Sequence, residues 1–111
     1  MVNFPFGKAD IHTQLAADTT IAITVNNYMT VIDCVTNQST ANKTINLTLG
    51  EGVPVGARLY YQVNTAATQT TTFGTGFLCP VLTGVLGKTF SAEFVYNGTN
   101  FQPVGAPYQI N

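Results

Sequence analysis

The stretch TINLTL, residues 44–49, alternates strictly between polar and apolar side chains. Ile45, Leu47 and Leu49 fall on one side of an extended chain, while threonine and asparagine side chains fall on the other. Because successive side chains of a β-strand point to opposite faces of its sheet, this pattern predicts a strand with one buried face.

Runs with a similar alternation recur over most of the chain from Thr19 onward. They include TTIAITV at 19–25, ARLYYQV at 57–63 and TFSAEFVY at 89–96. YMTVIDCV at 28–35 is apolar on both sides, which indicates a strand buried on two faces or lying at a subunit contact. No stretch fits a helix of ordinary length. We therefore predict an all-β domain over residues 19–111, a small antiparallel sandwich or barrel-like domain of about seven or eight short strands.

The segment SAEFVYNGTNFQPVG, residues 91–105, predicts a hairpin close to the C-terminus. An alternating run ends at Tyr96, the pair Asn97-Gly98 follows, and a second short apolar run begins at Phe101. Asparagine and glycine both tolerate the positive φ angles of a type I′ turn, which is the turn we expect here.

Residues 1–18 differ from the rest of the chain. They lack strand alternation, contain the chain's single histidine, and place Phe4 and Phe6 on either side of Pro5. Pro5 and Gly7 interrupt any amphipathic helix in this segment, which argues against a membrane-binding helix. We predict an extended N-terminal arm, with a frayed terminus as the alternative.

The chain of 111 residues is poor in charge. Charged residues make up 8% of it, against roughly 25% in an ordinary soluble domain. Burial against partner subunits would explain such a surface, and an unusual monomeric surface is the alternative. The net charge of −1, with scattered basic residues, argues against nucleic-acid binding. No apolar run reaches the roughly 20 residues of a membrane span, and the opening residues lack the features of a secretory signal.

No motif predicts an enzyme, a metal site or a cofactor. A serine–histidine–acid triad would need His12, which lies in the predicted arm, a poor place for preorganised catalysis. Asp33 and Glu93 could meet on strands, but nothing around them predicts a raised carboxyl pKa. Cys34 and Cys79 lie in apolar stretches without metal-ligand spacing, so we expect two reduced, buried thiols; a disulfide between them is geometrically possible.

Several segments resemble one class of bacteriophage proteins. The segments are TINLTLGEGVPVGARLYYQV, TTTFGTGF and GVLGKTFSAEFVYNGTNFQPVG. Together they are similar to small β-domains of the head-fibre and capsid-decoration proteins of tailed bacteriophages, crAss-like and other Bacteroides-type phages included. The element from Tyr96 to Phe101 also resembles phage fibre and tailspike modules, so the likeness is more specific to virion β-domains than to one position on the virion.

The resemblance implies a non-enzymatic structural protein, made in the host cytoplasm and located on the capsid surface of the virion. It implies a homotrimer whose β-faces bury tyrosine and valine side chains. For this interface we predict Tyr28, Val31, Tyr60, Val95 and Tyr108. The arm would dock on the major capsid protein or another virion protein. Its predicted anchor residues are Phe4, Pro5, Phe6, Ile11 and Leu15.

A receptor- or glycan-binding module at a phage fibre or tail tip is the alternative function, with host-surface glycans as the partner. Such a module would need a concave cluster of aromatic side chains on its surface. The chain contains no tryptophan, which weakens the glycan hypothesis.

Overall fold

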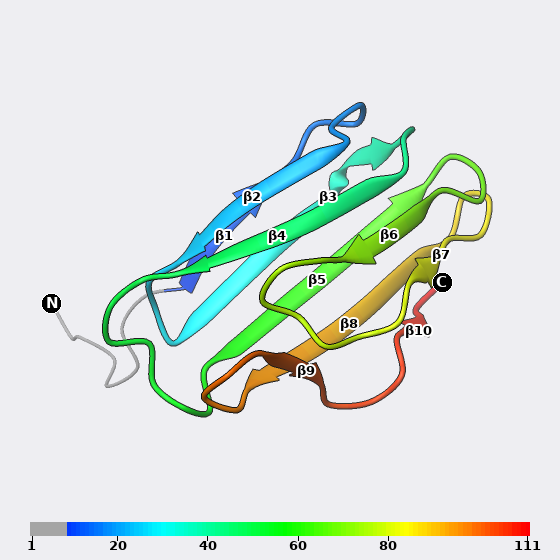
Figure 1. Ribbon diagram of the computed structural model, residues 1–111. Coiled ribbons are helices and arrows are strands. Elements are labelled where there is room, and N and C mark those ends of the chain that lie inside the picture. The colour runs from blue at the N-terminus through cyan, green and yellow to red at the C-terminus, as the bar shows by residue number, and fades with distance from the viewer. Residues whose placement is uncertain (1–8) are drawn as a thin grey trace, which may run out of the picture.

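The structure is a computed structural model that describes residues 9–111, and this part of the chain consists of strands and loops (Figure 1). Its strands are β1 (Ala9–Thr13), β2 (Thr20–Val25), β3 (Met29–Ser39), β4 (Lys43–Leu49), β5 (Arg58–Thr65), β6 (Thr70–Phe73), β7 (Leu82–Thr83), β8 (Thr89–Tyr96), β9 (Phe101–Pro103) and β10 (Tyr108–Gln109). The all-β prediction is confirmed. The described strands outnumber the predicted ones in part because β1 lacks the usual side-chain alternation and β10 is too short to show it.

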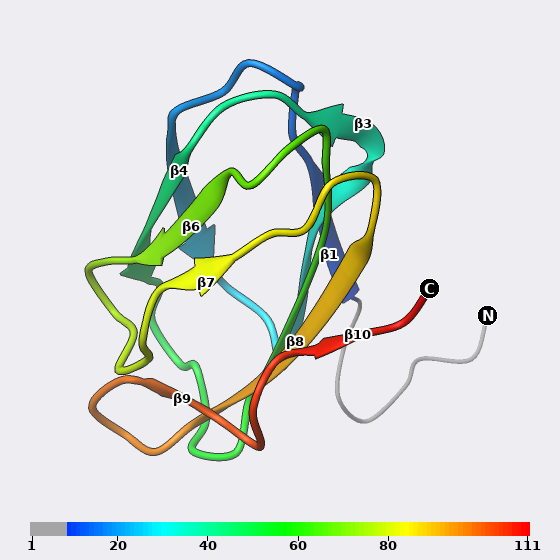
Figure 2. The same cartoon turned by 90° about the vertical axis from the view of Figure 1, so that its right-hand side faces the viewer.

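The strands form two mixed sheets that pack face to face as a sandwich. Sheet A has the order β1-β3-β5-β8-β10, with β9 also paired to β8, and sheet B has the order β2-β4-β6-β7. Figure 2 shows β4, β6 and β7 in one layer and β1 and β8 in the other. The apolar sides of the long strands face a common core between the layers.

From β1 to β6 the chain crosses to the opposite sheet after every strand. Neighbours within each sheet are then successive turns of one flattened coil, and they run parallel. The strands from β7 onward pair antiparallel with their neighbours and close the sandwich. The prediction of an antiparallel domain is therefore wrong for the first six strands. Side-chain alternation shows which face of a strand is buried, but it carries no information about the direction of the neighbouring strand.

The parallel register stacks equivalent side chains in the core. Ile21, Ile45 and Phe73 are register partners in sheet B and form an inward-facing ladder. Tyr61 of sheet A packs edge-on against Phe73, with ring centroids 5.6 Å apart. Its hydroxyl also shares a hydrogen bond of 2.6 Å with the Thr71 Oγ1 of sheet B. Tyr61 therefore joins the two layers through both a ring contact and a buried hydrogen bond.

Residues 9–18, which we predicted as part of an arm, are built into the domain. Strand β1 pairs with β3 along its whole length. Lys43 is buried at 2% exposure, and its Nζ donates to the backbone oxygens of Leu15 at 3.1 Å and Asp18 at 2.6 Å. The lysine thereby fixes the loop between β1 and β2. Residues 9–18 therefore belong to the β-domain, and the predicted boundary between residues 18 and 19 is corrected accordingly.

The side chains of β1 explain why its sequence did not predict a strand. Asp10 and His12 are the register partners of the buried residues Thr30 and Ile32, so the inward positions of this strand are polar. The usual alternation is then absent although the backbone is extended. The predicted anchor residues 4–6 lie outside the described residues, and their role stays a prediction.

The hairpin near the C-terminus is confirmed, but its turn differs from the expected one. Strands β8 and β9 pair antiparallel, with Tyr96 opposite Phe101. Gly98 has a φ of 98°, whereas Asn97 does not have a positive φ, so the turn is not type I′. Instead, the Asn97 side-chain oxygen accepts the N–H groups of Thr99 and Asn100, each at 2.9 Å. This asparagine orders a longer loop by capping its backbone.

Candidate functional site

The outward side of sheet A, here called the tyrosine face, carries most of the predicted trimer residues. Val31 on β3 is the register partner of Tyr60 on β5, which is in turn the partner of Glu93 on β8. Val95 lies two residues further along β8, opposite Arg58. These side chains are partly exposed, whereas most of their neighbours along each strand are buried in the core.

One pair of opposite charges lies on the tyrosine face. Arg58 Nη1 lies 3.2 Å from Glu93 Oε1, and both side chains are partly exposed. Partial burial, and secondly the Glu93 carboxylate, raise the pKa of the Tyr60 hydroxyl above its ordinary value. Tyr60 therefore stays neutral at physiological pH. A partner surface would not need to supply a compensating charge opposite this pair. Asp33, however, lies on the same side of β3 as Val31 and adds one negative charge to the face.

Of the remaining predicted residues, Tyr108 also lies on the tyrosine face, because its register partner Ser91 is paired with the outward-facing Gln62. The others lie toward the β1 edge of sheet A. Tyr108 on β10 is 60% exposed, next to β8. Tyr28 directly precedes β3, and its carbonyl oxygen accepts the Arg58 N–H at 2.7 Å. Ile11 and Leu15 are exposed on β1 and on the loop after it. The contacts predicted for these residues in an assembly stay predictions.

A second candidate surface lies where β7 to β10 close the sandwich. Eleven large apolar side chains are exposed among residues 9–111, and most of them belong to this part of the chain. We call the following set the apolar edge: Leu78, Val81, Val85, Leu86, Val104, Tyr108 and Ile110. Because Tyr108 belongs to both the apolar edge and the tyrosine face, the two surfaces meet at β10.

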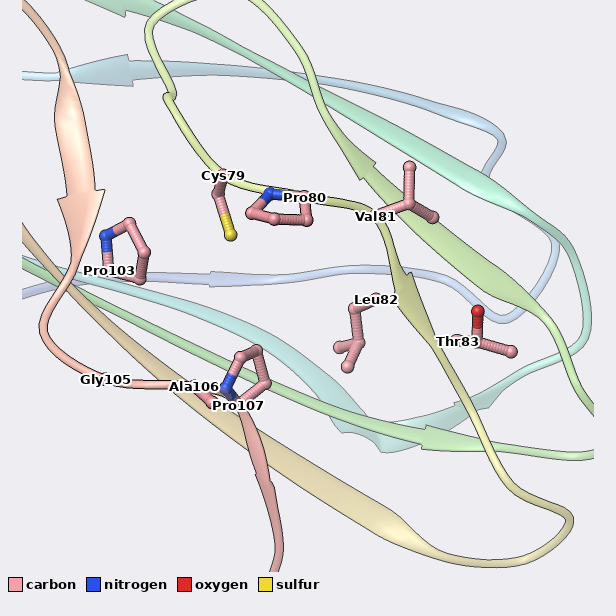
Figure 3. A pocket seen from close by; sticks show the side chains of 9 residues that line it. All are labelled: Cys79, Pro80, Val81, Leu82, Thr83, Pro103, Gly105, Ala106 and Pro107. Carbon is pink, nitrogen blue, oxygen red and sulfur yellow. The ribbon is translucent and has the colours of Figure 1, made fainter.

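A groove of about 340 Å³ adjoins the apolar edge, and Val81 belongs to both. Figure 3 shows two facing segments around it, one with Cys79 and Leu82 and the other with Pro103 and Pro107. The described residues that line it are Cys79, Pro80, Val81, Leu82, Thr83, Pro103, Gly105, Ala106 and Pro107. This described lining contains no aromatic ring, charge or carboxamide, so it offers neither stacking nor strong side-chain hydrogen bonding to a sugar.

Of the apolar edge, only Tyr108 was predicted from the sequence. The available signal was the segment LCPVLTGVLGK, residues 78–88, which is apolar yet broken by Pro80, Gly84 and Gly87. Proline and glycine keep such a segment out of the interior of a sheet. Most of its large apolar side chains are then presented at the surface, at an edge of the sandwich.

The two cysteines are both free thiols, but their surroundings differ. Cys34 is buried in the core, as predicted, and burial raises its pKa to about 11. Cys79 is only partly buried, in contrast to the prediction, because it lines the groove. Burial raises its thiol pKa as well. Neither thiol is activated as a nucleophile by these surroundings.

Residues 9–111 hold no cluster of three histidine, cysteine or carboxylate side chains placed to bind a metal ion. Within the same range, no helix is long and apolar enough to cross a membrane. The His12 Nε2 atom is buried without a hydrogen-bond partner among the described residues.

Comparisons with known proteins do not assign the chain to a family. No protein-family model matches the chain, and no significant match was found among curated proteins or solved structures. The class of protein defined by the fold is therefore a small two-sheet β-sandwich with mixed strand directions.

Proposed function

We propose that the protein is a non-enzymatic structural component of a bacteriophage virion. In this proposal it decorates the capsid surface as a homotrimer, and the segment before β1 attaches it to the major capsid protein or another virion protein. The resemblance of its β-segments to head-fibre and decoration domains suggests the class. The surface of the domain supports a role in assembly.

The apolar edge is the observation that carries the proposal. Seven of the eleven large apolar side chains that are exposed among residues 9–111 belong to this edge, and each exposed group forgoes the free energy of burial. Leu86 is 68% exposed, Tyr108 is 60% exposed and Val104 is 55% exposed. The described residues that line the adjoining groove carry no charge. A contact between copies through this edge and the tyrosine face would remove these side chains from water.

The oligomeric state tests the trimer, with two matched leucines as test and control. Leu86 is 68% exposed on the apolar edge, and Leu15 is 65% exposed after β1, at the opposite edge of sheet A. We expect light scattering to give a mass that is a multiple of three chains. Leu86→Ser should reduce this mass threefold, whereas Leu15→Ser should leave it unchanged. A wild-type mass that is not a multiple of three, or an equal response of the two variants, would overturn the trimer.

Capsid binding tests the attachment, and the structure sets the limit of the deletion. Removing residues up to 18 would also remove β1 and the backbone acceptors of the buried Lys43. The informative variant therefore lacks only residues 2–8. We expect it to keep the melting temperature of the wild type but to stop sedimenting with purified capsids. Sedimentation equal to that of the wild type would contradict attachment by this segment.

A receptor- or glycan-binding module remains the second hypothesis from the sequence. It requires a concave aromatic cluster, whereas the described lining of the groove carries no aromatic ring. A glycan array with the wild-type protein distinguishes the two functions, since saturable binding to one glycan class would favour the second.

A further inference from the structure

The free edges of the two sheets are not equally protected against pairing with another strand. In sheet A, β1 carries Asp10 and His12 at inward positions, a device that discourages strand addition. Strands β7 and β10 are two residues long and follow Pro80 and Pro107 closely. Short strands and nearby prolines likewise limit edge pairing.

Strand β2 has none of these protections. It is six residues long, TIAITV, and contains neither charge nor proline. It is the terminal strand of sheet B, and within residues 9–111 only β4 pairs with it. Ile21, Ile23 and Val25 are buried in the core, so the register of this edge is fixed. The strand is therefore presented as an ordered, uncharged template.

The backbone groups that face outward from β2 can be identified. The carbonyl oxygen of Val25 accepts the N–H of Gly50, which directly follows β4, at 2.7 Å. Because backbone groups alternate sides along a strand, the odd-numbered residues of β2 face β4. The N–H and C=O groups of Thr20, Ala22 and Thr24 consequently point away from β4 and have no partner strand among the described residues.

The sequence of this edge is symmetric about its middle. TIAIT, residues 20–24, reads the same in both directions. In an antiparallel pair of two β2 strands centred on Ala22, each threonine lies opposite a threonine and each isoleucine opposite an isoleucine. The two alanines meet at the centre, where small side chains suit a close approach. Thr–Thr pairs and pairs of β-branched apolar residues are favourable across antiparallel strands.

The hydrogen-bonding phase agrees with this register. In an antiparallel pair, every second residue exchanges both of its N–H···O=C bonds with the residue opposite. Centring on Ala22 pairs Thr20 with Thr24 and Ala22 with Ala22, which are the residues whose backbone groups face outward. Sequence symmetry and backbone orientation therefore select the same arrangement, although they are independent observations.

We propose that β2 is a self-association site that binds β2 of a second copy of this chain, antiparallel and centred on Ala22. The contact is isologous, so it closes after two chains and leaves no free β2 edge. It joins the two copies of sheet B into one continuous sheet. This inference goes beyond the proposed function, since it does not depend on a virion role or on the threefold contact at the apolar edge.

The first test uses like charges at the centre of the pair. Ala22→Lys places two ammonium groups opposite each other, while each side chain stays in solvent in the single chain. Thr72→Lys is the control, because Thr72 is also exposed on the outer face of sheet B but lies on β6. By light scattering over a dilution series, we expect Ala22→Lys to halve the mass and Thr72→Lys to leave it unchanged. The factor of two separates this contact from the threefold one, which Leu86→Ser would reduce by a factor of three.

The second test detects the register directly. Paired Cα atoms that exchange hydrogen bonds lie about 5.5 Å apart, which suits a disulfide. Ala22→Cys in a Cys79→Ser background should therefore form a covalent dimer with oxidised glutathione, and Thr72→Cys in the same background should not. Absence of the Ala22→Cys dimer, or equal cross-linking of both variants, would overturn the proposal. Failure of the mass to halve in Ala22→Lys would overturn it as well.

Discussion

The coiled part of the molecule, β1 to β6, and the closing part, β7 to β10, differ in how their strands pair and in which side chains they expose. The coiled part pairs its strands in parallel ladders and buries even Lys43 with backbone acceptors. The closing part contains two- and three-residue strands and exposes most of the large apolar side chains that the described residues leave in solvent. We infer from this comparison that the coil contributes more to the stability of the fold, and that the closing part would supply the contact surface of the proposed assembly.

The largest effect should come from the buried lysine of the coiled part. Lys43→Met keeps the length of the side chain but removes the donor to the Asp18 carbonyl oxygen, which Nζ binds at 2.6 Å. A buried acceptor without a partner is costly, and the β1–β2 loop loses its tether. We expect the free energy of unfolding to fall by about 3 kcal/mol, measured by urea denaturation.

The control for this prediction is Lys88→Met, because Lys88 is exposed in the closing part. Its free energy of unfolding should change by less than about 0.5 kcal/mol. Equal urea midpoints for Lys43→Met and the wild type would show that the buried amine does not fix the loop, and the stability attributed to the coil would then need another source.

A smaller effect should separate two glycines within the region from 78 to 111. Gly84 is buried where this region packs on β5, and an added Cβ would lie 2.6 Å from Cγ2 and 2.9 Å from Cβ of Thr65. An added Cβ at Gly105 would meet nothing within 4 Å. We expect Gly84→Ala to lower the free energy of unfolding by about 2 kcal/mol through overpacking.

Gly105→Ala should leave stability within about 0.5 kcal/mol of the wild type, since this surface position meets open space. Both variants can be compared by their urea midpoints. If Gly84→Ala is as stable as Gly105→Ala, the 78–111 region can shift away from β5 at little cost in free energy. The two parts of the molecule would then differ more than we propose, with the closing part only loosely attached.

The sequence was sufficient to predict the buried faces but not the connections between strands. Ile45 and Leu47 reveal an inward face because burial acts on each side chain individually. That β4 lies between β2 and β6 depends on loops that cross the sandwich, and no local pattern records this path. The strand β1 was hidden for a different reason, since Asp10 and His12 take inward positions at a sheet edge.

The candidate surfaces were predictable in part. Val31 and Tyr60 were selected from runs that are apolar or aromatic on both sides, and the structure places both on the tyrosine face. The apolar edge depends on how Pro80 and Gly84 bend an apolar segment to the surface, which requires the tertiary structure. The symmetry of residues 20–24 is visible in the sequence, but it gains a meaning only when β2 is known to be a terminal strand.

The smallest predicted effect is a loss of stability in alkaline solution, which originates in the coiled part. The ordinary pKa of the Cys34 thiol is 9.0, and burial raises it to about 11 in the folded protein. Between these values the unfolded chain has released a proton that the folded chain still binds. The free energy of unfolding therefore falls as pH rises, by about 1 kcal/mol near pH 10. The buried hydroxyl of Tyr61, whose pKa is also raised by burial, acts in the same direction at higher pH.

Urea midpoints at about pH 8 and about pH 10 measure this loss. Cys34→Ala should lower stability at both pH values, because it leaves space in the core, but it should reduce the difference between them. The matched variant is Cys79→Ala in the closing part, which should reduce the difference less because its thiol is only partly buried. If the two variants reduce the difference equally, burial of a thiol does not distinguish the coil from the closing part. If Cys34→Ala keeps the full difference, the alkaline loss comes from groups outside the core of the coil.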